Sequence, residues 1–197
     1  MIPKGVFCLE IGDWCESLTD GTSVKPVLKL LATAPSRKAP YIHRDIITEA
    51  ELVYYLKKWP MQKHTKFPIL YLAMHGKSGE ICLKKENGRE HRIDLDTLAG
   101  MLEGKCHKRI IHFGSCSTQL VHGHQVNSFL KRTGALAVSG FTKNVDWEDS
   151  TAFELIYLSA IQENALTRAG MTAVFKKLKK KVGTLYSELG FRYKMLP

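Results

Sequence analysis

Two long apolar runs constrain the fold of this 197-residue chain more than any other feature. They occupy residues 67–74 (FPILYLAM) and 109–114 (RIIHFG), and each predicts a strand that is buried on both faces. Similar runs alternate along the chain with helical patterns, which is typical of a mostly parallel sheet covered by helices on both faces. The sequence therefore predicts an α/β fold.

The other predicted elements follow the same alternation. Strand composition recurs at residues 5–12, 41–46, 80–83 and 135–141. Helical periodicity covers residues 24–31, 48–59, 94–103, 127–133 and 149–162, with Thr22 or Ser23 as the cap of the first helix. The sequence has no internal repeat and no linker long enough to divide it, so we expect one domain over residues 1–197.

The formal net charge of +10 comes mostly from one segment. Residues 167–197 hold eight Lys or Arg and one Glu, a net charge of +7. Apolar residues at 171, 174, 175, 178 and 182 fall on one face of a helix there, and five lysines between 176 and 181 surround the other. We expect a basic amphipathic helix and tail that packs on the domain. The alternative is that this helix also binds an acidic partner, nucleic acid or an anionic membrane.

Hydropathy and cysteine usage favour a cytoplasmic protein. No apolar run approaches the roughly 18–20 residues that span a bilayer, and the start Met1–Gly5 shows no signal-peptide pattern. The five cysteines are odd in number and irregularly spaced, which is a poor framework for disulfides. We expect some of them in the core and at least one as a reactive thiol.

Reactive side chains follow both of the strongest strands. Residues 67–74 run into His75 and Gly76, and residues 109–114 run into Ser115, Cys116 and Ser117. Ligands of parallel sheets bind beyond the carboxyl ends of the strands, so we expect His75 and Cys116 to meet at one edge. An imidazole there can take the proton of a thiol that is otherwise mostly protonated at neutral pH.

The neighbours of this pair fit the same chemistry. Gly76 allows its N–H to approach a substrate carbonyl, and together with the N–H of Cys116 it is a candidate oxyanion hole. Taken singly, each side chain has a simpler interpretation. A lone cysteine usually lies in a core, and a lone histidine at a strand end is usually only hydrogen-bonded. The joint occurrence favours catalysis.

Four stretches carry a resemblance to a known group of proteins. They read YLAMHGKSGEICL, IDLDTLAGMLEG, RIIHFGSCSTQL and GALAVSGFTKNVDWEDSTAFELIYLSAI. Their order over roughly residues 67–180 resembles the CHAT domain, a caspase-like (clan CD) peptidase type related to separase and the caspases. The resemblance implies a single caspase-like three-layer sandwich, with His75 as the catalytic histidine, Cys116 as the nucleophile and Gly76 as the oxyanion-hole glycine.

Two loops are candidates for substrate binding. The acidic loop at residues 144–149 resembles the loop that lines the S1 pocket of separase-like enzymes. The resemblance implies an S1 carboxylate in this loop, with Asp146 as the first candidate and Asp149 as the second. Such a carboxylate favours Arg or Lys at P1. The alternative for Asp149 is that it caps the next helix. Asp13 and Trp14 follow the first strand, as a wall of the cleft or a cover for the core.

The resulting prediction is a cysteine endopeptidase that cleaves a protein or peptide substrate through an acyl-enzyme. The caspase signature Gln-Ala-Cys-x-Gly is absent, so cleavage after Asp is not implied. An activating partner protein is one open possibility for its control. The alternatives are a catalytically inactive caspase-like scaffold and a nucleic-acid-binding protein that uses the lysine-rich helix.

We predict no metal and no cofactor. His122 and His124 lie near Cys106, His107 and His112 in the sequence, but no Cys-x2-Cys or His-x3-His pair occurs. His112 falls inside a buried strand and is expected to be a hydrogen-bonded core histidine. A glycine-rich phosphate loop is also absent.

Overall fold

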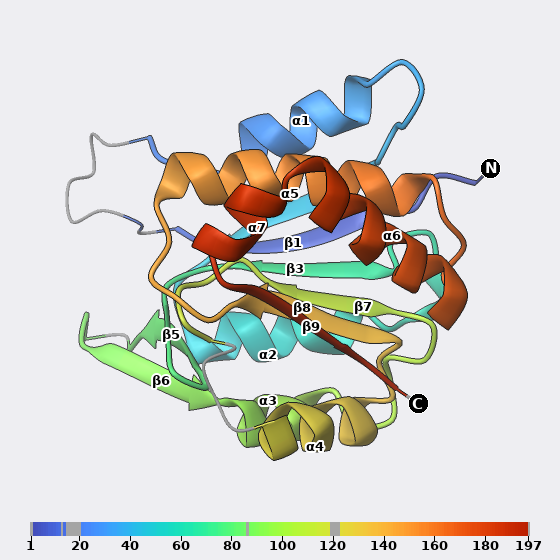
Figure 1. Ribbon diagram of the computed structural model, residues 1–197. Helices are drawn as coiled ribbons and strands as arrows, with labels where there is room; N and C mark the ends of the chain where they lie inside the picture. The colour runs from blue at the N-terminus through green and yellow to red at the C-terminus, as the bar shows by residue number, and fades with distance from the viewer. Residues whose placement is uncertain (1, 13, 15–20, 86, 119–122, 197) are drawn as a thin grey trace.

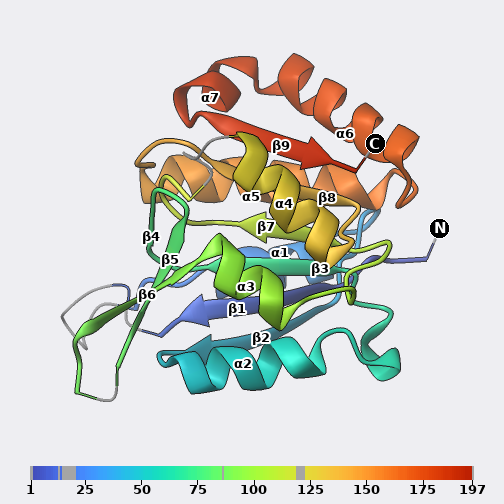
Figure 2. The same cartoon turned by 90° about the horizontal axis from the view of Figure 1, so that it is seen from below.

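The chain folds around a six-stranded sheet with helices on both faces (Figures 1 and 2). The computed structural model describes residues 2–12, 14, 21–85, 87–118 and 123–196. The strand order is β2-β1-β3-β7-β8-β9, in which β9 alone is antiparallel to its neighbour. The strands are β1 (Val6–Ile11), β2 (Tyr41–Ile46), β3 (Ile69–Ala73), β7 (Ile110–Phe113), β8 (Ala137–Phe141) and β9 (Phe191–Met195). The predicted α/β fold with a mostly parallel sheet is confirmed.

Burial on both faces explains why the central strands read as continuous apolar runs. Every residue of β1, β3, β7 and β8 is buried, so both faces of these strands need apolar side chains. One face packs against α2 (Glu49–Lys58), α3 (Leu95–Met101) and α4 (Gly123–Thr133). The other packs against α1 (Lys25–Thr33), α5 (Trp147–Gln162) and α6 (Arg168–Lys181). The core is thus two apolar layers that the sheet separates.

A small second sheet interrupts the crossover from β3 to β7. It consists of β4 (Gly76–Lys77), β5 (Glu80–Lys84) and β6 (Glu90–Asp94), joined in antiparallel order. The predicted extended piece at 80–83 is β5, whereas β6 has no counterpart among the predicted strands. Asp94 ends β6 and caps α3, because its carboxylate accepts the N–H of Thr97 at 2.7 Å.

The C-terminal segment is built into the domain. The apolar face of α6 is buried at Met171, Val174, Phe175 and Leu178, as the periodicity predicts. A further helix, α7 (Gly183–Glu188), leads into β9. The prediction of a tail is therefore wrong, because residues 191–195 pair with β8 and complete the sheet. The ring of Tyr193 stacks on that of Phe175 with centroids 3.5 Å apart.

Two helix starts differ from their predicted caps. The first residue before α1 is Val24, not Thr22 or Ser23, although the Ser23 hydroxyl accepts the N–H of Lys25 at 3.1 Å. The helix predicted from 149 begins at Trp147, with Asp146 as its cap. Among the helices that the structure describes, none combines the length and the apolar character needed to cross a bilayer.

Candidate active site

A cavity of about 460 Å³ lies at the carboxyl edge of the sheet. Its walls come from the loops that follow β1, β3, β7 and β8 and from the first two turns of α5. It is lined by Trp14, Thr22, Val24, Tyr71, Met74, His75, Gly114, Cys116, Val145, Trp147, Glu148, Ser150, Thr151 and Glu154. His75 and Cys116 therefore share one cavity, and Trp14 forms part of its wall.

The register of the sheet explains why these two side chains line the same cavity. In the parallel pair β3–β7, each residue lies opposite the one 41 positions later, from Ile69 with Ile110 to Leu72 with Phe113. His75 and Cys116 are separated by the same offset. The last paired residues, Leu72 and Phe113, lie three positions before them, so the two side chains follow the strands at the same edge of the sheet.

Gly76 lies directly against the loop that carries Cys116. A Cβ atom placed on Gly76 would lie 2.6 Å from the carbonyl oxygen of Cys116 and 2.8 Å from Cβ of Ser115, and would also overlap Oγ1 of Thr118. Only a hydrogen fits there. This close approach explains the glycine after the histidine.

The N–H of Gly76 points away from β5. Gly76 pairs with Ile81, and the adjacent Cys82 N–H donates to the His75 carbonyl at 2.8 Å. The Gly76–Ile81 pair is therefore one of the non-hydrogen-bonded pairs of an antiparallel ladder. Within the residues that the structure describes, the N–H of Cys116 also has no backbone or side-chain acceptor.

Hydrogen bonds join the loop after β7 to the loop between β8 and α5. The N–H of Val145 donates to Sγ of Cys116 at 3.5 Å, and Cys116 is half-buried. The next residue, Ser117, has a φ of 53°, an uncommon conformation for a residue other than glycine. Its N–H donates to the carbonyl of Lys143 at 2.9 Å and its hydroxyl to Oδ1 of Asn144 at 3.0 Å. These bonds fix where the sulfur lies.

His75 is exposed to the cavity and held through one ring nitrogen. Nε2 lies 3.1 Å from the carbonyl oxygen of Trp14, and the indole ring meets the imidazole edge-on with centroids 5.0 Å apart. A carbonyl oxygen can only accept, so Nε2 carries a proton and donates it. In the neutral ring, Nδ1 is then the basic nitrogen.

Trp14 is in turn anchored by a buried carboxylate. Its Nε1 donates to Glu10 at 2.7 Å, and Glu10 is 1% exposed. The carboxylate also accepts from the Ser23 hydroxyl, the Val24 N–H and Nε2 of His43, the last at 2.5 Å. Burial raises the pKa of Glu10, but these hydrogen bonds more than offset it, so the pKa lies below its ordinary value.

Glu10 and His43, together with Asp45, are the one group in the described part of the chain whose side chains could together ligate a metal ion. One ligand atom from each of the three lies within 4.8 Å of the other two. However, Nε2 of His43 and Oε2 of Glu10 are already 2.5 Å apart, whereas two ligands of a bound zinc ion are roughly 3 Å or more apart. The group fits a hydrogen-bonded anchor for the loop rather than a cation.

Asp146 and Asp149 are not part of the cavity lining. Both are exposed, and the carboxylate of Asp146 accepts the N–H of Asp149 at 3.1 Å. This backbone hydrogen bond lowers the pKa of Asp146. Asp146 is the N-cap of α5, so the interpretation of Asp149 as the cap is wrong. The carboxylates that do line the cavity belong to Glu148 and Glu154.

Glu154 belongs to a buried polar network below the cavity. It accepts from the Tyr71 hydroxyl and from Nε2 of His112, the latter at 2.9 Å. Nδ1 of His112 lies 3.0 Å from the hydroxyl of Ser139, so this histidine is a hydrogen-bonded core residue. Glu154 did not stand out in the sequence. Its one signal there is that it is the single charge in the apolar stretch AFELIYLSAI of α5.

Cys116 differs from the other described cysteines. Cys8, Cys82 and Cys106 are buried, and burial raises the pKa of each thiol, that of Cys106 to about 12. Such thiols are poor nucleophiles at neutral pH. Asp13, Cys15 and His122 lie outside the described residues.

Comparison with known proteins gives a family for nearly the whole chain. The family described as "Family of unknown function (DUF6642)" matches residues 3–194. The chain belongs to this family. A search of the curated proteins found no match for this DUF6642 protein.

One of the solved structures that match is a secreted C11 cysteine protease from Bacteroides thetaiotaomicron in complex with an irreversible peptide inhibitor. It is 13% identical to the DUF6642 chain, with a TM-score of 0.47. The aligned part covers 73% of this chain and 49% of the protease, so the chain spans about half the length of that structure.

Proposed function

We propose that this protein is a cysteine peptidase that cleaves a protein or peptide substrate with Cys116 as the nucleophile and His75 as the base. The observation that carries the proposal is the pairing of the two side chains at one register, in one cavity. The bond from Nε2 to the carbonyl of Trp14 supports it, because it leaves Nδ1 as the basic nitrogen. A base held in place by a third group is the usual arrangement of an activated nucleophile.

The chemistry follows the ordinary course of acyl transfer. The proton of the Cys116 thiol moves to Nδ1 of His75, and the sulfur attacks the carbonyl carbon of the scissile bond. The tetrahedral intermediate collapses, the C–N bond breaks, and Nδ1 returns the proton to the leaving amine. A water molecule, deprotonated by Nδ1 of His75, then attacks the thioester carbon. The C–S bond breaks, the acid product leaves, and Nδ1 returns the proton to the sulfur of Cys116.

Two backbone N–H groups are suited to the oxyanion. The N–H of Gly76 points away from its strand partner, and that of Cys116 has no acceptor among the described residues. Donors aimed at the developing negative charge are often the largest single contribution to acyl-transfer catalysis. The close packing of Gly76 on Cys116 supports a shared role.

A preference for Arg or Lys at P1 remains part of the proposal. The carboxylates that support it are Glu148 and Glu154, since these line the cavity and Asp146 and Asp149 do not. The apolar walls at Met74, Val24 and Trp147 suit the aliphatic part of such a side chain. The kinship with caspase-like, CHAT-type peptidases rests on the sequence motifs and is proposed with the same activity.

Cleavage of a fluorogenic peptide with Arg at P1 tests the proposal. We expect Cys116→Ala and His75→Ala each to lower kcat/KM by about 1,000-fold or more. Cys82→Ala, which removes a buried thiol outside the cavity, is the matched control and should keep the activity. A peptidyl acyloxymethyl ketone should add to Cys116 of the wild type alone, as mass spectrometry would show.

Two results would count against peptidase activity. Full activity in Cys116→Ala would mean that another group does the chemistry. Slow alkylation of Cys116 in the folded wild type, at a rate like that of the buried cysteines, would favour a catalytically inactive scaffold.

A further inference from the structure

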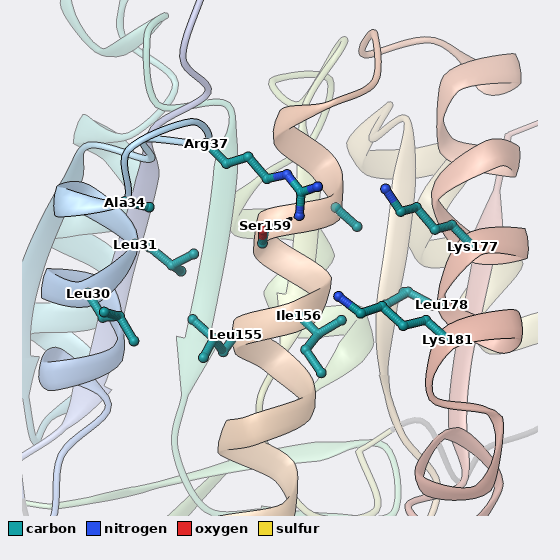
Figure 3. A pocket seen from close by; sticks show the side chains of 11 residues that line it. Leu30, Leu31, Ala34, Arg37, Leu155, Ile156, Ser159, Lys177, Leu178 and Lys181 are labelled. Atoms are coloured by element: carbon teal, nitrogen blue, oxygen red, sulfur yellow. Dashed lines mark hydrogen bonds between the residues drawn. The ribbon is translucent and has the colours of Figure 1, made fainter.

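A second hollow lies on the outer surface of the helical layer, away from the proposed active site. It is a groove of about 240 Å³ between α1 and α6, with α5 beneath it (Figure 3). It shares no lining residue with the cavity that holds His75 and Cys116. We call it the α1–α6 groove.

The floor of the α1–α6 groove is apolar. Leu31 and Leu178 are at most 3% exposed and form its base, while Leu155 and Ile156 of α5 are only half-buried. Leu30 stands on the edge with 55% of its surface exposed. A helix with apolar residues on all sides, such as α5, is normally covered all round. Here its outer face is left open between its two neighbours.

The rim of the groove is basic. Arg37 reaches in from the segment after α1, and Lys177 and Lys181 of α6 point toward α5 from the other side (Figure 3). Glu163 forms ion pairs with both Arg37 and Lys177. The single carboxylate of Glu163 is therefore shared by two of the three cations on the rim. Lys181 forms no ion pair within 4.0 Å among the residues that the structure describes, although its charge also acts on Glu163 from farther away.

We propose that the α1–α6 groove binds an amphipathic, acidic helical segment of a partner protein. Apolar anchors of the segment would fill the floor, and its Asp or Glu residues would pair with Lys181 and the neighbouring cations. The volume lies below the 300–1,000 Å³ of sites that enclose a small molecule, and it suits one or two side chains. Apolar anchors spaced one helical turn apart are the usual way in which a helix binds such a groove.

The charge and shape of the groove favour this occupant over three others. A second copy of the chain would bring another net charge of +10 to a basic surface. A flat bilayer cannot reach Leu31 and Leu178 at the base of the hollow. Nucleic acid gains nothing from an aliphatic floor without aromatic rings on which bases could stack.

Neighbouring lysines provide a matched pair of variants for the test. Lys180 and Lys181 are both exposed on α6, but only Lys181 lines the groove. Lys180→Glu and Lys181→Glu change the total charge equally. The probe is a fluorescent helical peptide of about 18 residues with Leu at the anchor positions (i, i+3, i+4, i+7) and Glu elsewhere. The same peptide with Lys in place of Glu is its control.

Fluorescence anisotropy with the full chain gives the first readout. We expect the acidic peptide to bind the wild type, and Lys181→Glu to weaken binding about fivefold to tenfold. Lys180→Glu should change it less than about twofold, and the Lys-containing peptide should not bind. Methyl NMR shifts of Leu30, Leu155 and Ile156 on titration would locate the peptide in the groove. Cys116→Ala should bind the peptide as the wild type does, so the test does not depend on peptidase activity.

Three outcomes would overturn the proposal. The first is no binding at about 1 mM peptide. The second is equal weakening by Lys180→Glu and Lys181→Glu, which would mean general attraction to α6. The third is selective loss, in Lys181→Glu alone, of binding to phosphatidylserine vesicles or duplex DNA, which would assign the groove to a membrane or to nucleic acid.

Discussion

Replacing Gly76 with alanine tests the close packing between the proposed oxyanion-hole strand and the nucleophile loop. The new Cβ would lie 2.6 Å from the carbonyl oxygen of Cys116, and ordinary contact begins at 3.4 Å. The oxygen must therefore retreat by about 0.8 Å. The loop cannot swing away freely, because the N–H of Ser117 is bonded to Lys143 and the sulfur of Cys116 accepts from Val145.

A displacement of this size has a calculable effect. A misplacement of about 1 Å at a catalytic group costs roughly 100-fold in rate, so we expect kcat/KM of Gly76→Ala to fall about 30-fold to 100-fold. Overpacking costs about 1–3 kcal/mol, and a loss of about 2 kcal/mol lowers the Tm of a chain this long by about 4–8 °C. Peptide cleavage, Cys116 alkylation and thermal unfolding measure these effects separately.

Gly183→Ala is the control for the glycine substitution itself. Nothing lies within 4 Å of a Cβ on Gly183, so this variant should keep the activity and Tm of the wild type. If Gly76→Ala also kept the kcat/KM, the alkylation rate and the Tm of the wild type, the packing argument would be refuted.

Three further predictions follow from the same contacts. The pKa of Glu10 lies below its ordinary value of 4.5, so Glu10 stabilises the fold above that pH and this stability is lost as the pH falls further. The Tm of the wild type should then fall more steeply than that of Glu10→Gln between about pH 5 and pH 3, and parallel curves would contradict this. Iodoacetamide at pH 7 should label Cys116 faster than Cys8 or Cys106, whose pKa values are raised by burial; equal rates in peptide mapping would contradict it. Tyr193→Ala removes the ring stacked on Phe175 and should lower the free energy of unfolding in urea by about 2–3 kcal/mol. The exposed neighbour Arg192 is the control, and an equal loss in Arg192→Ala would argue against the stacking contribution.

Strands buried on both faces were predictable, and so was the edge strand β2, but β6 and β9 were not. The runs that became β3 and β7 are apolar throughout, because both faces meet helices. In β6 only Ile93 is buried, and in β9 only Phe191 is, so neither segment shows an apolar run. β9 also pairs with β8, a strand about 50 residues earlier. The local sequence of this basic segment contains no pattern that predicts this pairing.

The residues of the candidate site also differ in how far the sequence could predict them. The position of His75 and Cys116 in one cavity was predictable, because both follow recognisable strands and parallel pairing brings such strand ends together. The role of Glu154, on α5, depends on a tyrosine of β3 and a histidine of β7, which only the folded structure brings to it. Asp146 was assigned to the S1 pocket because its acidic loop resembles the loop that lines this pocket in separase-like enzymes. Its distance of three residues from Asp149 is instead the spacing of a helix cap.

The reversed direction of β9 has a consequence for attaching other groups to this protein. Because β9 is antiparallel, its last residue, Met195, lies beside Ala137 at the amino edge of the parallel strands. The chain enters β1 from that same edge, and both ends lie on the side opposite the cavity loops (Figure 1). A tag, a fluorescent domain or a surface tether joined at either end would extend away from His75 and Cys116. The mouth of the cavity would stay open to a large polypeptide in every such fusion.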